Sequence, residues 1–333
     1  MLSGKRRGLN LPQRYLRCLR ALLVSRKYFE NWLSAGAKYF LWRRSLLKIS
    51  TLDVKCNDGH ALTLPPNCYG LLLAGLLDGL FKGLVARGED KAVITARGFD
   101  IPLRELSSSE TVLEALRHGW EYDEVHGYWF RDDVRFRHMR CYVLQVFDYG
   151  EYEGVDVSGK TVVDVGAGYG ETAIYFLKRG AERVIAIEPC PEAFKEMLEN
   201  IKLNGVEDRV VLVNAAISSK RGAIYVECPS GRRVVNVLTL EDVARKYGVH
   251  GGTLKMDCEG CEYDVVLNDY EHVKLFDEVY FEYHAHITKR PVELLLKKLS
   301  EDFVCEIVSG EHFYERHGFN ERLLGLVRCV KKK

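Results

Sequence analysis

Residues 151–333 are predicted to fold as an α/β domain with a mostly parallel sheet, preceded by a helical and mixed extension over residues 1–150. From Lys160 onward, strand-like and helix-like segments alternate, which is typical of a parallel sheet covered by helices on both faces. The central strand-like segments are short and rich in valine, as expected for strands buried on both faces. A glycine-rich turn joins the first strand to the first helix, at the place where open α/β sheets bind ligands.

The elements of this domain follow one another in a regular order. The predicted strands are Thr161–Val165, Val184–Ile187, Val210–Val213, Ala223–Glu227, Leu254–Asp257, Glu278–Tyr283, Phe303–Val308 and Leu323–Val330. The predicted helices are Glu171–Arg179, Pro191–Leu203, Leu240–Lys246, Glu262–Asn268 and Val292–Leu299.

The extension shows a less regular pattern. Leucines at helical spacing, with arginines between them, predict a helix over residues 11–48. The apolar run Tyr69–Ala86 is interpreted as a buried helix, because two charged residues inside it make it unsuitable for crossing a bilayer. Residues 106–116 are predicted to form a helix that Ser109 caps.

Residues 118–152 are dense in aromatic side chains. Two interpretations stay open at this point, a lid over an acceptor site and ordinary core packing. The aromatic residues are Trp120, Tyr128, Trp129, Phe130, Tyr142, Phe147, Tyr149 and Tyr152.

Charge and cysteine content suggest where the protein works. The net charge of the 333-residue chain is +1, so the whole chain has no bulk attraction for polyanions. Residues 1–50 differ, with twelve lysines and arginines against one acid, Glu30. Ten scattered cysteines and no recognisable secretory signal predict reduced thiols in a cytoplasmic protein.

The glycine-rich turn has the spacing D-x-G-x-G-x-G, from Asp164 to Gly170. A dinucleotide-binding turn would need its third glycine at position 171, where this chain has Glu171. An acid there suits a ligand without phosphates. Asp164 is therefore predicted to pair with an ammonium group, and Glu188, after the next strand, with two ribose hydroxyls.

These groups favour S-adenosylmethionine over a nicotinamide cofactor. The end of the third strand is predicted to lie near the adenine, since small residues there leave room for a flat ring. The predicted cofactor-binding residues are Asp164, Gly166, Ala167, Gly168, Tyr169, Gly170, Glu188, Asn214 and Ala215.

From about Gly150 to His286 the sequence resembles the FkbM-type methyltransferases, a class I, S-adenosylmethionine-dependent family with a Rossmann-like fold. The similar segments are VVDVGAGYGETAIYF, AIEPCPEAFKEMLENIKLNG, LTLEDV and LKMDCEGCEYDVV. The resemblance implies a seven-stranded sheet whose last strand is antiparallel. It also implies a methyl donor at the glycine loop and hydroxyl groups of glycans or small molecules as acceptors.

The acceptor is expected above the carboxyl ends of two neighbouring strands of the main sheet, Leu254–Asp257 and Glu278–Tyr283. Asp257, Glu259 and His284 are the predicted catalytic residues, with His284 as general base because an imidazole titrates near neutrality. The alternatives are structural: Asp257 could cap the next helix, Glu259 and Glu262 could be first-turn acids, and His284 could be a packing residue.

No metal is predicted, although Asp257, Glu259 and His284 together could hold a divalent cation. Cys258 and Cys261 form a C-x-x-C pair, but no second closely spaced pair completes a zinc site. The FkbM resemblance places small residues at these two positions, so both cysteines are interpreted as packing residues.

The predicted function is S-adenosylmethionine-dependent O-methylation of a glycan or small molecule. The alternative is an RNA methyltransferase whose basic N-terminus binds phosphates, although no Asn/Asp-Pro-Pro-aromatic segment follows the fourth strand. A third hypothesis is a non-enzymatic scaffold. Residues 11–48 could pack on the catalytic domain, lie on an anionic membrane surface, or bind nucleic acid.

Overall fold

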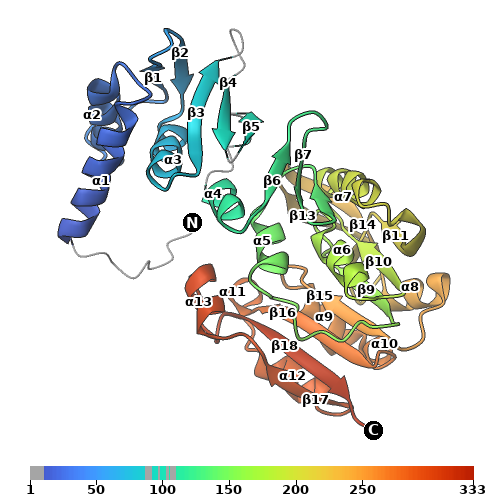
Figure 1. Cartoon of the computed structure of the whole chain (residues 1–333). Coiled ribbons are helices and arrows are strands. Elements are labelled where there is room, and N and C mark those ends of the chain that lie inside the picture. The colour runs from blue at the N-terminus through green and yellow to red at the C-terminus, as the bar shows by residue number, and fades with distance from the viewer. Residues whose placement is uncertain (1–10, 87–91, 97, 103–104, 106–109) are drawn as a thin grey trace. The chain divides into compact units, whose positions relative to one another are not determined.

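A computed structural model describes residues 11–86, 92–96, 98–102, 105 and 110–333. These residues form two compact units, one up to Leu144 and one from Gln145 to Lys333 (Figure 1). The division lies close to residue 150, where the sequence places the start of the α/β domain. Each unit is described here by itself.

The C-terminal unit is built on one seven-stranded sheet of order β11-β10-β9-β15-β16-β18-β17. The first five strands in this order are parallel to one another, and β18 runs antiparallel to both β16 and β17. The strands are β9 (Thr161–Val165), β10 (Arg183–Ile187), β11 (Val210–Val213), β15 (Thr253–Met256), β16 (Glu278–His284), β17 (Phe303–Ile307) and β18 (Leu324–Lys331). The predicted Rossmann-like α/β sheet, with its antiparallel last strand, is confirmed.

Helices follow the strands because each parallel connection needs a crossover. They are α6 (Glu171–Lys178), α7 (Pro191–Leu203), α8 (Leu240–Tyr247), α9 (Cys261–Asn268), α10 (Tyr270–Val273), α11 (Ala285–Thr288), α12 (Glu293–Leu299) and α13 (Glu311–His317). Helices α8, α9, α10 and α12 contact one another, and their apolar side chains join the central strands in the largest core cluster. The α/β elements therefore begin and end within a few residues of the predicted bounds.

A small sheet beside the main one was only partly predicted. Strands β12 (Ala216–Ile217), β13 (Gly222–Cys228) and β14 (Gly231–Leu238) form it, and β13 and β14 make a hairpin. The sequence predicts β13 alone. The glycine and serine at the tip and the largely exposed residues of β14 give no clear alternation of apolar and polar side chains, so the pattern did not reveal the second arm.

Three cysteine pairs are bridged, which corrects the prediction of reduced thiols. The disulfides are Cys190–Cys228, Cys258–Cys261 and Cys305–Cys329. The first joins the start of α7 to the β13–β14 hairpin, and the third joins β17 to β18. Because the partners of these two pairs lie on different elements, their proximity could not be read from spacing. The C-x-x-C pair is a bridge rather than two packing residues.

The N-terminal unit mixes helices with short antiparallel sheets (blue to green in Figure 1). Its elements are α1 (Leu11–Ser25), α2 (Trp32–Arg43), β1 (Leu52–Lys55), β2 (Ala61–Leu64), α3 (Pro66–Leu77), β3 (Phe81–Ala86), β4 (Ala92–Ala96), β5 (Phe99–Pro102), α4 (Glu110–Arg117), β6 (Glu121–Asp123), β7 (Tyr128–Arg131) and β8 (Val134–Phe136). Helix α5 (Cys141–Phe147) crosses into the second unit.

Two predictions for this unit are wrong. The helix expected over residues 11–48 is interrupted, because Phe29 forms a β-bridge with Cys56 and Asn31 hydrogen-bonds the backbone of β1. The helix expected over Tyr69–Ala86 ends at Leu77, since Gly79 turns the chain with φ +69° and β3 follows. Ser109, the expected cap of α4, lies outside the described residues.

The aromatic segment is only partly core, since Tyr142 and Tyr149 are exposed. Trp120 and Trp129 are completely buried and pack with Tyr122 and Phe136 around the β6–β7–β8 sheet. These side chains therefore serve as packing, which leaves no lid role for them. In the part of the chain that the structure describes, no helix is long and apolar enough to cross a membrane.

Candidate donor and acceptor site

The glycine loop lies between β9 and α6, at the carboxyl edge of the sheet. The backbone amides of Gly166 and Ala167 both donate to the carbonyl of Ile187, at distances of 2.9 and 3.0 Å. Gly166 has φ +76°, and a Cβ there would lie 1.8 Å from the Asp257 carbonyl oxygen. The loop therefore passes so close to the end of β15 that only glycine fits.

Glu188 fastens this loop to the end of β10. Its Oε2 accepts from the Gly168 amide at 3.0 Å, and its Oε1 accepts from the Cys190 amide at 2.8 Å. Burial raises the pKa of Glu188 to about 7. Each oxygen has a second lone pair, so a carboxylate fixed in this way can also accept from two hydroxyl groups of a ribose.

Asn214 and Ala215 follow β11, beside Glu188. The Asn214 side-chain amide donates to the carbonyls of Glu188 and Pro189, at 2.8 and 3.1 Å. Its amide oxygen is the atom that could accept from a ring amino group. Ala215 is buried, and its role beside an adenine stays a prediction.

Asp164 does not occupy the predicted position. Its side chain is completely buried, and it pairs with the Lys255 ammonium at 3.0 Å and accepts from the Thr172 hydroxyl at 2.5 Å. Lys255 also donates to the Gly166 carbonyl at 2.8 Å. A direct contact between Asp164 and a donor does not fit this geometry, so we assign Asp164 and Lys255 to holding the loop from below.

Glu171 belongs to the loop more closely than the sequence indicates. Its Oε2 accepts from the Tyr169 amide at 2.9 Å, and the Tyr169 carbonyl accepts from Asn200 at 2.8 Å. Burial raises the pKa of Glu171 to about 8. The sequence indicates only that Glu171 excludes a pyrophosphate. Gly170 has φ +90°, so the chain turns between Tyr169 and Glu171, and the Glu171 carboxylate reaches back to the Tyr169 amide.

A cluster of acids and one histidine lies at the neighbouring strand ends. Met256 pairs with Phe281, so Asp257 and Glu282 come next to each other at the carboxyl ends of β15 and β16. Glu282 and His284 share one face of β16, because alternate residues of a strand point the same way. Sheet register therefore brings together residues that are 25 positions or more apart in sequence.

His284 is held in a fixed orientation. Its Nδ1 lies 3.1 Å from Glu262 Oε1, which also accepts from the His284 backbone amide at 2.8 Å. Its Nε2 faces Asp257, Glu259 and Glu282 at 3.7, 3.6 and 3.8 Å. Burial disfavours the imidazolium, but the hydrogen bond to Glu262 and the carboxylate charges outweigh it and raise the pKa to about 10.

This pKa corrects the prediction that His284 is a general base. An imidazole that is already protonated at neutral pH cannot take a proton from an acceptor. The carboxylates around it can, and Asp257, which is partly exposed, is the best placed of them.

The sequence also left open that Asp257 caps the next helix and that Glu259 and Glu262 are acids of its first turn. The positions of these residues relative to α9 bear on both alternatives. Asp257 does not cap α9, whose N-cap is Gly260 with φ +109°. Glu262 lies in the first turn of α9, but its carboxylate contacts His284 and the Gly260 amide. Glu259 is exposed, with φ +56°.

Glu282 and Tyr152 are site residues that sequence reasoning missed. Glu282 is 6% exposed, and burial beside Asp257 raises its pKa well above the ordinary value. The buried Tyr152 hydroxyl donates to Asp257 Oδ2 at 3.4 Å. Glu282 could have been found as a charged residue inside the apolar strand Val279–Tyr283, whereas Tyr152 comes from a loop without regular pattern.

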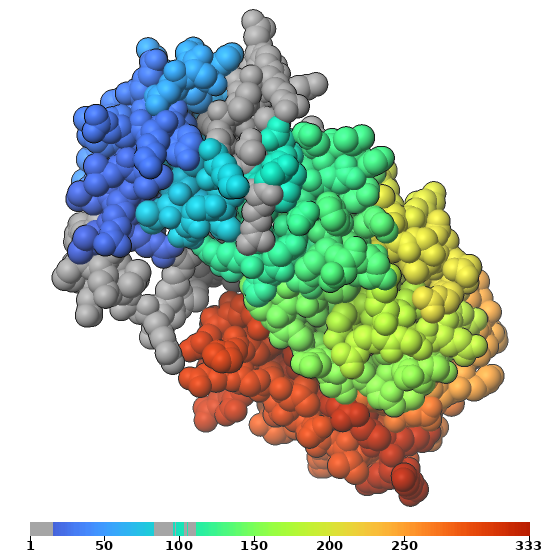
Figure 2. All heavy atoms as spheres, in the orientation of Figure 1, coloured from blue at the N-terminus to red at the C-terminus, as the bar shows by residue number. Residues whose placement is uncertain are grey.

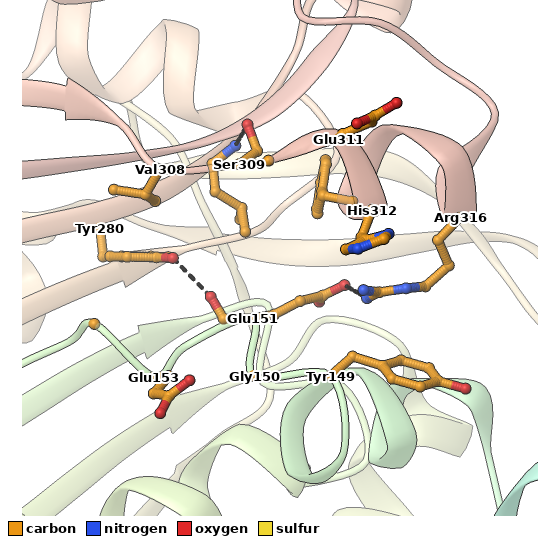
Figure 3. Close-up of a pocket in the computed structure, with 14 residues that line it drawn as sticks. Tyr149, Gly150, Glu151, Glu153, Tyr280, Val308, Ser309, Glu311, His312 and Arg316 are labelled. Carbon is orange, nitrogen blue, oxygen red and sulfur yellow. Dashed lines mark hydrogen bonds and ion pairs between the residues drawn. The ribbon is translucent and has the colours of Figure 1, made fainter.

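A pocket of about 500 Å³ lies within the C-terminal unit, between the loop that holds Glu151 and the segment before and within α13 (Figure 3). Its floor holds Glu151, whose carboxylate accepts from Arg316 at 2.7 Å and whose carbonyl accepts from the Tyr280 hydroxyl at 2.6 Å. Tyr149, Ser309 and His312 add polar groups to the wall, as Figure 3 shows. None of the cluster residues lines this pocket, but Glu151 precedes Tyr152, whose hydroxyl donates to Asp257, so one short segment contributes to both.

Comparison with known proteins bears on the donor half of the site. Residues 154–229 match a family model described as the TRM5/TYW2 methyltransferase domain. A stretch of 58 residues is 50% identical to the ribosomal protein L11 methyltransferase of Alteromonas mediterranea, covering 17% of this chain and 20% of that protein. The chain therefore matches about a fifth of the length of this curated relative.

Two solved structures are similar at low identity. An rRNA methylase from Streptococcus thermophilus has 12% identity and a TM-score of 0.36, with 54% of this chain and 91% of that chain covered. An O-methyltransferase from Bacillus cereus, in complex with SAH, has 12% identity and a TM-score of 0.34, with 58% and 90% covered.

Residues 154–229 are therefore similar to methyltransferase domains, and the sheet has the Rossmann-like order expected from the sequence. The matched family model is not that of the FkbM-type enzymes, so the finer resemblance remains a prediction.

Proposed function

We propose that this chain is an S-adenosylmethionine-dependent methyltransferase that acts on an oxygen acceptor. The observation that carries the proposal is the juxtaposition of two groups of residues. Glu188 and the Gly166–Gly170 loop form a cradle at one strand end, and the Gly166 Cβ position lies against Asp257, the first residue of the acid cluster. A donor in the cradle would thus lie beside acids able to receive a proton.

S-adenosylmethionine, when bound, supplies a methyl group whose carbon–sulfur bond breaks as the acceptor's oxygen–carbon bond forms, with the electron pair left on sulfur. The chain has to align the acceptor and remove its proton. Asp257 is held by Tyr152 through Oδ2, so Oδ1 faces the cluster and can take the hydroxyl proton. The pocket beside Glu151 would hold the rest of the acceptor.

The experiment that tests this function is transfer of a radiolabelled methyl group from S-adenosylmethionine into cell extracts. The extract is divided into RNA, protein, polysaccharide and small-molecule fractions before incubation with the full chain. Label that appears with wild type and falls at least 100-fold with Asp257→Ala supports the proposal, since general-base catalysis contributes about 10²–10⁴-fold. Absence of transfer to every fraction, with donor still bound, contradicts it.

RNA is a second candidate for the acceptor, and two observations favour it over a glycan. The matched relatives are a TRM5/TYW2 methyltransferase domain and a ribosomal protein methyltransferase, and no glycan enzyme is among the proteins named above. The described basic residues on and around α1 and α2, including Arg20, Arg26 and Lys38, are exposed (blue in Figure 2). Exposed cations can neutralise phosphates. A ribose hydroxyl of RNA would be an oxygen acceptor and would also agree with RNA as the substrate.

A further inference from the structure

We propose that Asp257, Glu282 and His284 form a binding site for a divalent cation of the Mn²⁺ type. One ligand atom from each residue can be chosen so that all three lie within 4.8 Å of one another. Two carboxylates and one imidazole provide the mixed oxygen and nitrogen donors that such a cation accepts.

The distances in the cluster are too long for hydrogen bonds and suitable for an ion. His284 Nε2 lies 3.7 Å from Asp257 Oδ1 and 3.8 Å from Glu282 Oε1. Ligand atoms about 2.1 Å from one octahedral ion are about 3.0 Å apart when adjacent and about 4.2 Å apart when opposite. The observed separations fall between these values, so small side-chain rotations would place all three atoms around one cation.

Glu282 is an independent indication of a missing partner. Its side chain is buried and its Oε1 faces the His284 ring, whose Nε2 lies 3.8 Å away, too far for a hydrogen bond. A buried carboxylate without hydrogen bonds is costly. It is directed into the cluster, where a cation would compensate its charge.

Charge balance supports the same conclusion. Four carboxyl groups, those of Asp257, Glu259, Glu262 and Glu282, surround a single imidazole. Even a protonated imidazole leaves this arrangement with an excess of negative charge. The Lys255 ammonium also acts on Asp257 but is paired with Asp164 at 3.0 Å, so a divalent cation would compensate the excess that remains.

The orientation of His284 is the one that metal-binding histidines have. Glu262 Oε1 accepts from Nδ1, which leaves Nε2 directed at Asp257 and Glu282, where a cation would take the place of the Nε2 proton. A carboxylate behind a histidine in this way fixes its tautomer and strengthens it as a ligand. Glu262 is itself held by the Gly260 amide at 3.0 Å, so we identify it as a positioning residue.

The nearby Cys258–Cys261–Glu262 group does not compete for the ion. Both sulfurs are engaged in a disulfide, so neither is a free thiolate. The cation would instead lie at the acceptor side. With Asp257 as its ligand rather than as the proton acceptor, it could orient an acceptor oxygen and lower its pKa, so that the proton is lost to water. This catalytic role rests on the proposed function, whereas cation binding itself does not.

The test is a titration of the full chain, stripped of metal by a chelator, with Mn²⁺, followed by electron paramagnetic resonance of the free ion. Wild type should bind one Mn²⁺ per chain. Glu282→Gln and His284→Gln should each weaken binding at least 10-fold, and Glu262→Gln should weaken it about 10- to 100-fold through the histidine. Glu293→Gln, a surface change, and the double variant Cys258→Ser/Cys261→Ser should bind as wild type does.

Circular dichroism and thermal unfolding confirm that each variant is folded. Absence of Mn²⁺ binding by the folded wild type, or equal affinity in Glu282→Gln and wild type, overturns the site. Binding that disappears only in the cysteine double variant also overturns it. Calorimetry with S-adenosylmethionine on the same preparations separates the two proposals. Donor binding without Mn²⁺ binding contradicts the cation site alone. Mn²⁺ binding without donor binding contradicts the methyltransferase proposal alone.

Discussion

At the scale of single residues, the donor cradle depends on carboxylates whose oxygens are already bonded to the backbone. Glu188 is the main example, because its two oxygens hold Gly168 and Cys190 before any ligand arrives. A carboxylate oriented in advance loses little freedom when it binds hydroxyls, which strengthens binding.

Glu188→Ala is expected to weaken binding of S-adenosylmethionine by about 1.5–3 kcal/mol, since hydrogen bonds to a charged group are lost. That corresponds to about 10- to 150-fold in the dissociation constant. Isothermal calorimetry measures it, with Glu207→Gln, an exposed acid outside the site, as the control. Equal affinities for Glu188→Ala and wild type would remove Glu188 from the donor site.

The raised pKa of Glu188 makes donor binding dependent on pH. Hydroxyl groups donate to the ionised carboxylate, so donor affinity should rise as the pH increases through about 7. Binding at pH 6 should release protons, which calorimetry detects in buffers of different ionisation enthalpy. The raised pKa also affects stability, because the folded, donor-free chain binds the Glu188 proton more tightly than the unfolded chain. The resulting gain in unfolding free energy is fully present below pH 4.5 and is lost as the pH rises through about 7. A Glu188→Gln variant should show none of this proton release.

The buried pair of Asp164 and Lys255 gives a stability prediction. Lys255→Met leaves the Asp164 carboxylate buried without its cation, which should cost about 3–5 kcal/mol of unfolding free energy. Denaturant unfolding measures the loss. The double variant Asp164→Asn/Lys255→Met removes both charges and should be more stable than Lys255→Met alone, whereas a further loss would show that the two residues act separately.

At the scale of elements, the β13–β14 hairpin is attached to the donor side by covalent and polar contacts. Cys228 at the end of β13 is bridged to Cys190 at the start of α7, and Arg233 lies 3.6 Å from Glu192. Because the Cys190 amide also donates to Glu188, the bridge connects the hairpin to a donor-binding carboxylate.

Cys228→Ser should lower the unfolding free energy by about 2–4 kcal/mol, as the loss of a disulfide that closes a loop of this length does. It should also weaken donor binding, because the strand end that carries Glu188 loses a tether. Cys329→Ser, which removes the β17–β18 bridge, should lower stability without changing donor affinity. Thermal unfolding and calorimetry on both variants separate the two effects, and equal donor affinities would disconnect the hairpin from the cradle.

At the scale of the whole molecule, charge is distributed unevenly between the two units. The acid cluster lies in the C-terminal unit, whereas residues 1–50 hold twelve basic residues and one acid. If RNA is the acceptor, these basic residues supply most of the affinity, and binding should fall steeply with salt.

Replacing Arg20, Arg26 and Lys27 by alanine in the full chain should reduce the salt slope of binding to single-stranded RNA by up to about 2, at about 0.7 for each phosphate that is no longer neutralised. Fluorescence anisotropy at salt concentrations of about 50 to 200 mM measures it, and Lys246→Ala on α8 is the control. An unchanged slope contradicts an RNA role for α1 and its following turn. Sedimentation with anionic and neutral vesicles then tests the membrane alternative, which requires salt-sensitive binding to the anionic vesicles only.

The sequence by itself determined the strands of the main sheet, the helices α6, α7, α8, α9 and α12, and the glycine loop. Periodicity and turn residues are local properties, so Thr161–Val165 and Pro191–Leu203 could be placed to the residue. The spacing of the loop and the acid after β10 likewise predicted that Gly168 and Glu188 lie together, and the structure joins them by a hydrogen bond.

Tertiary structure alone decided which of these residues meet. Asp164 turned inward because Lys255, 91 positions later, lies in the neighbouring strand and needs a counter-charge. Glu282 joined Asp257 through the register of two parallel strands, and the pKa of His284 is raised because Glu262 faces it from α9. At these positions, burial and contacts between residues far apart in sequence decide which groups meet and how their pKa values shift. The local sequence pattern, from which the helices and strands were predicted, contains neither burial nor long-range contacts.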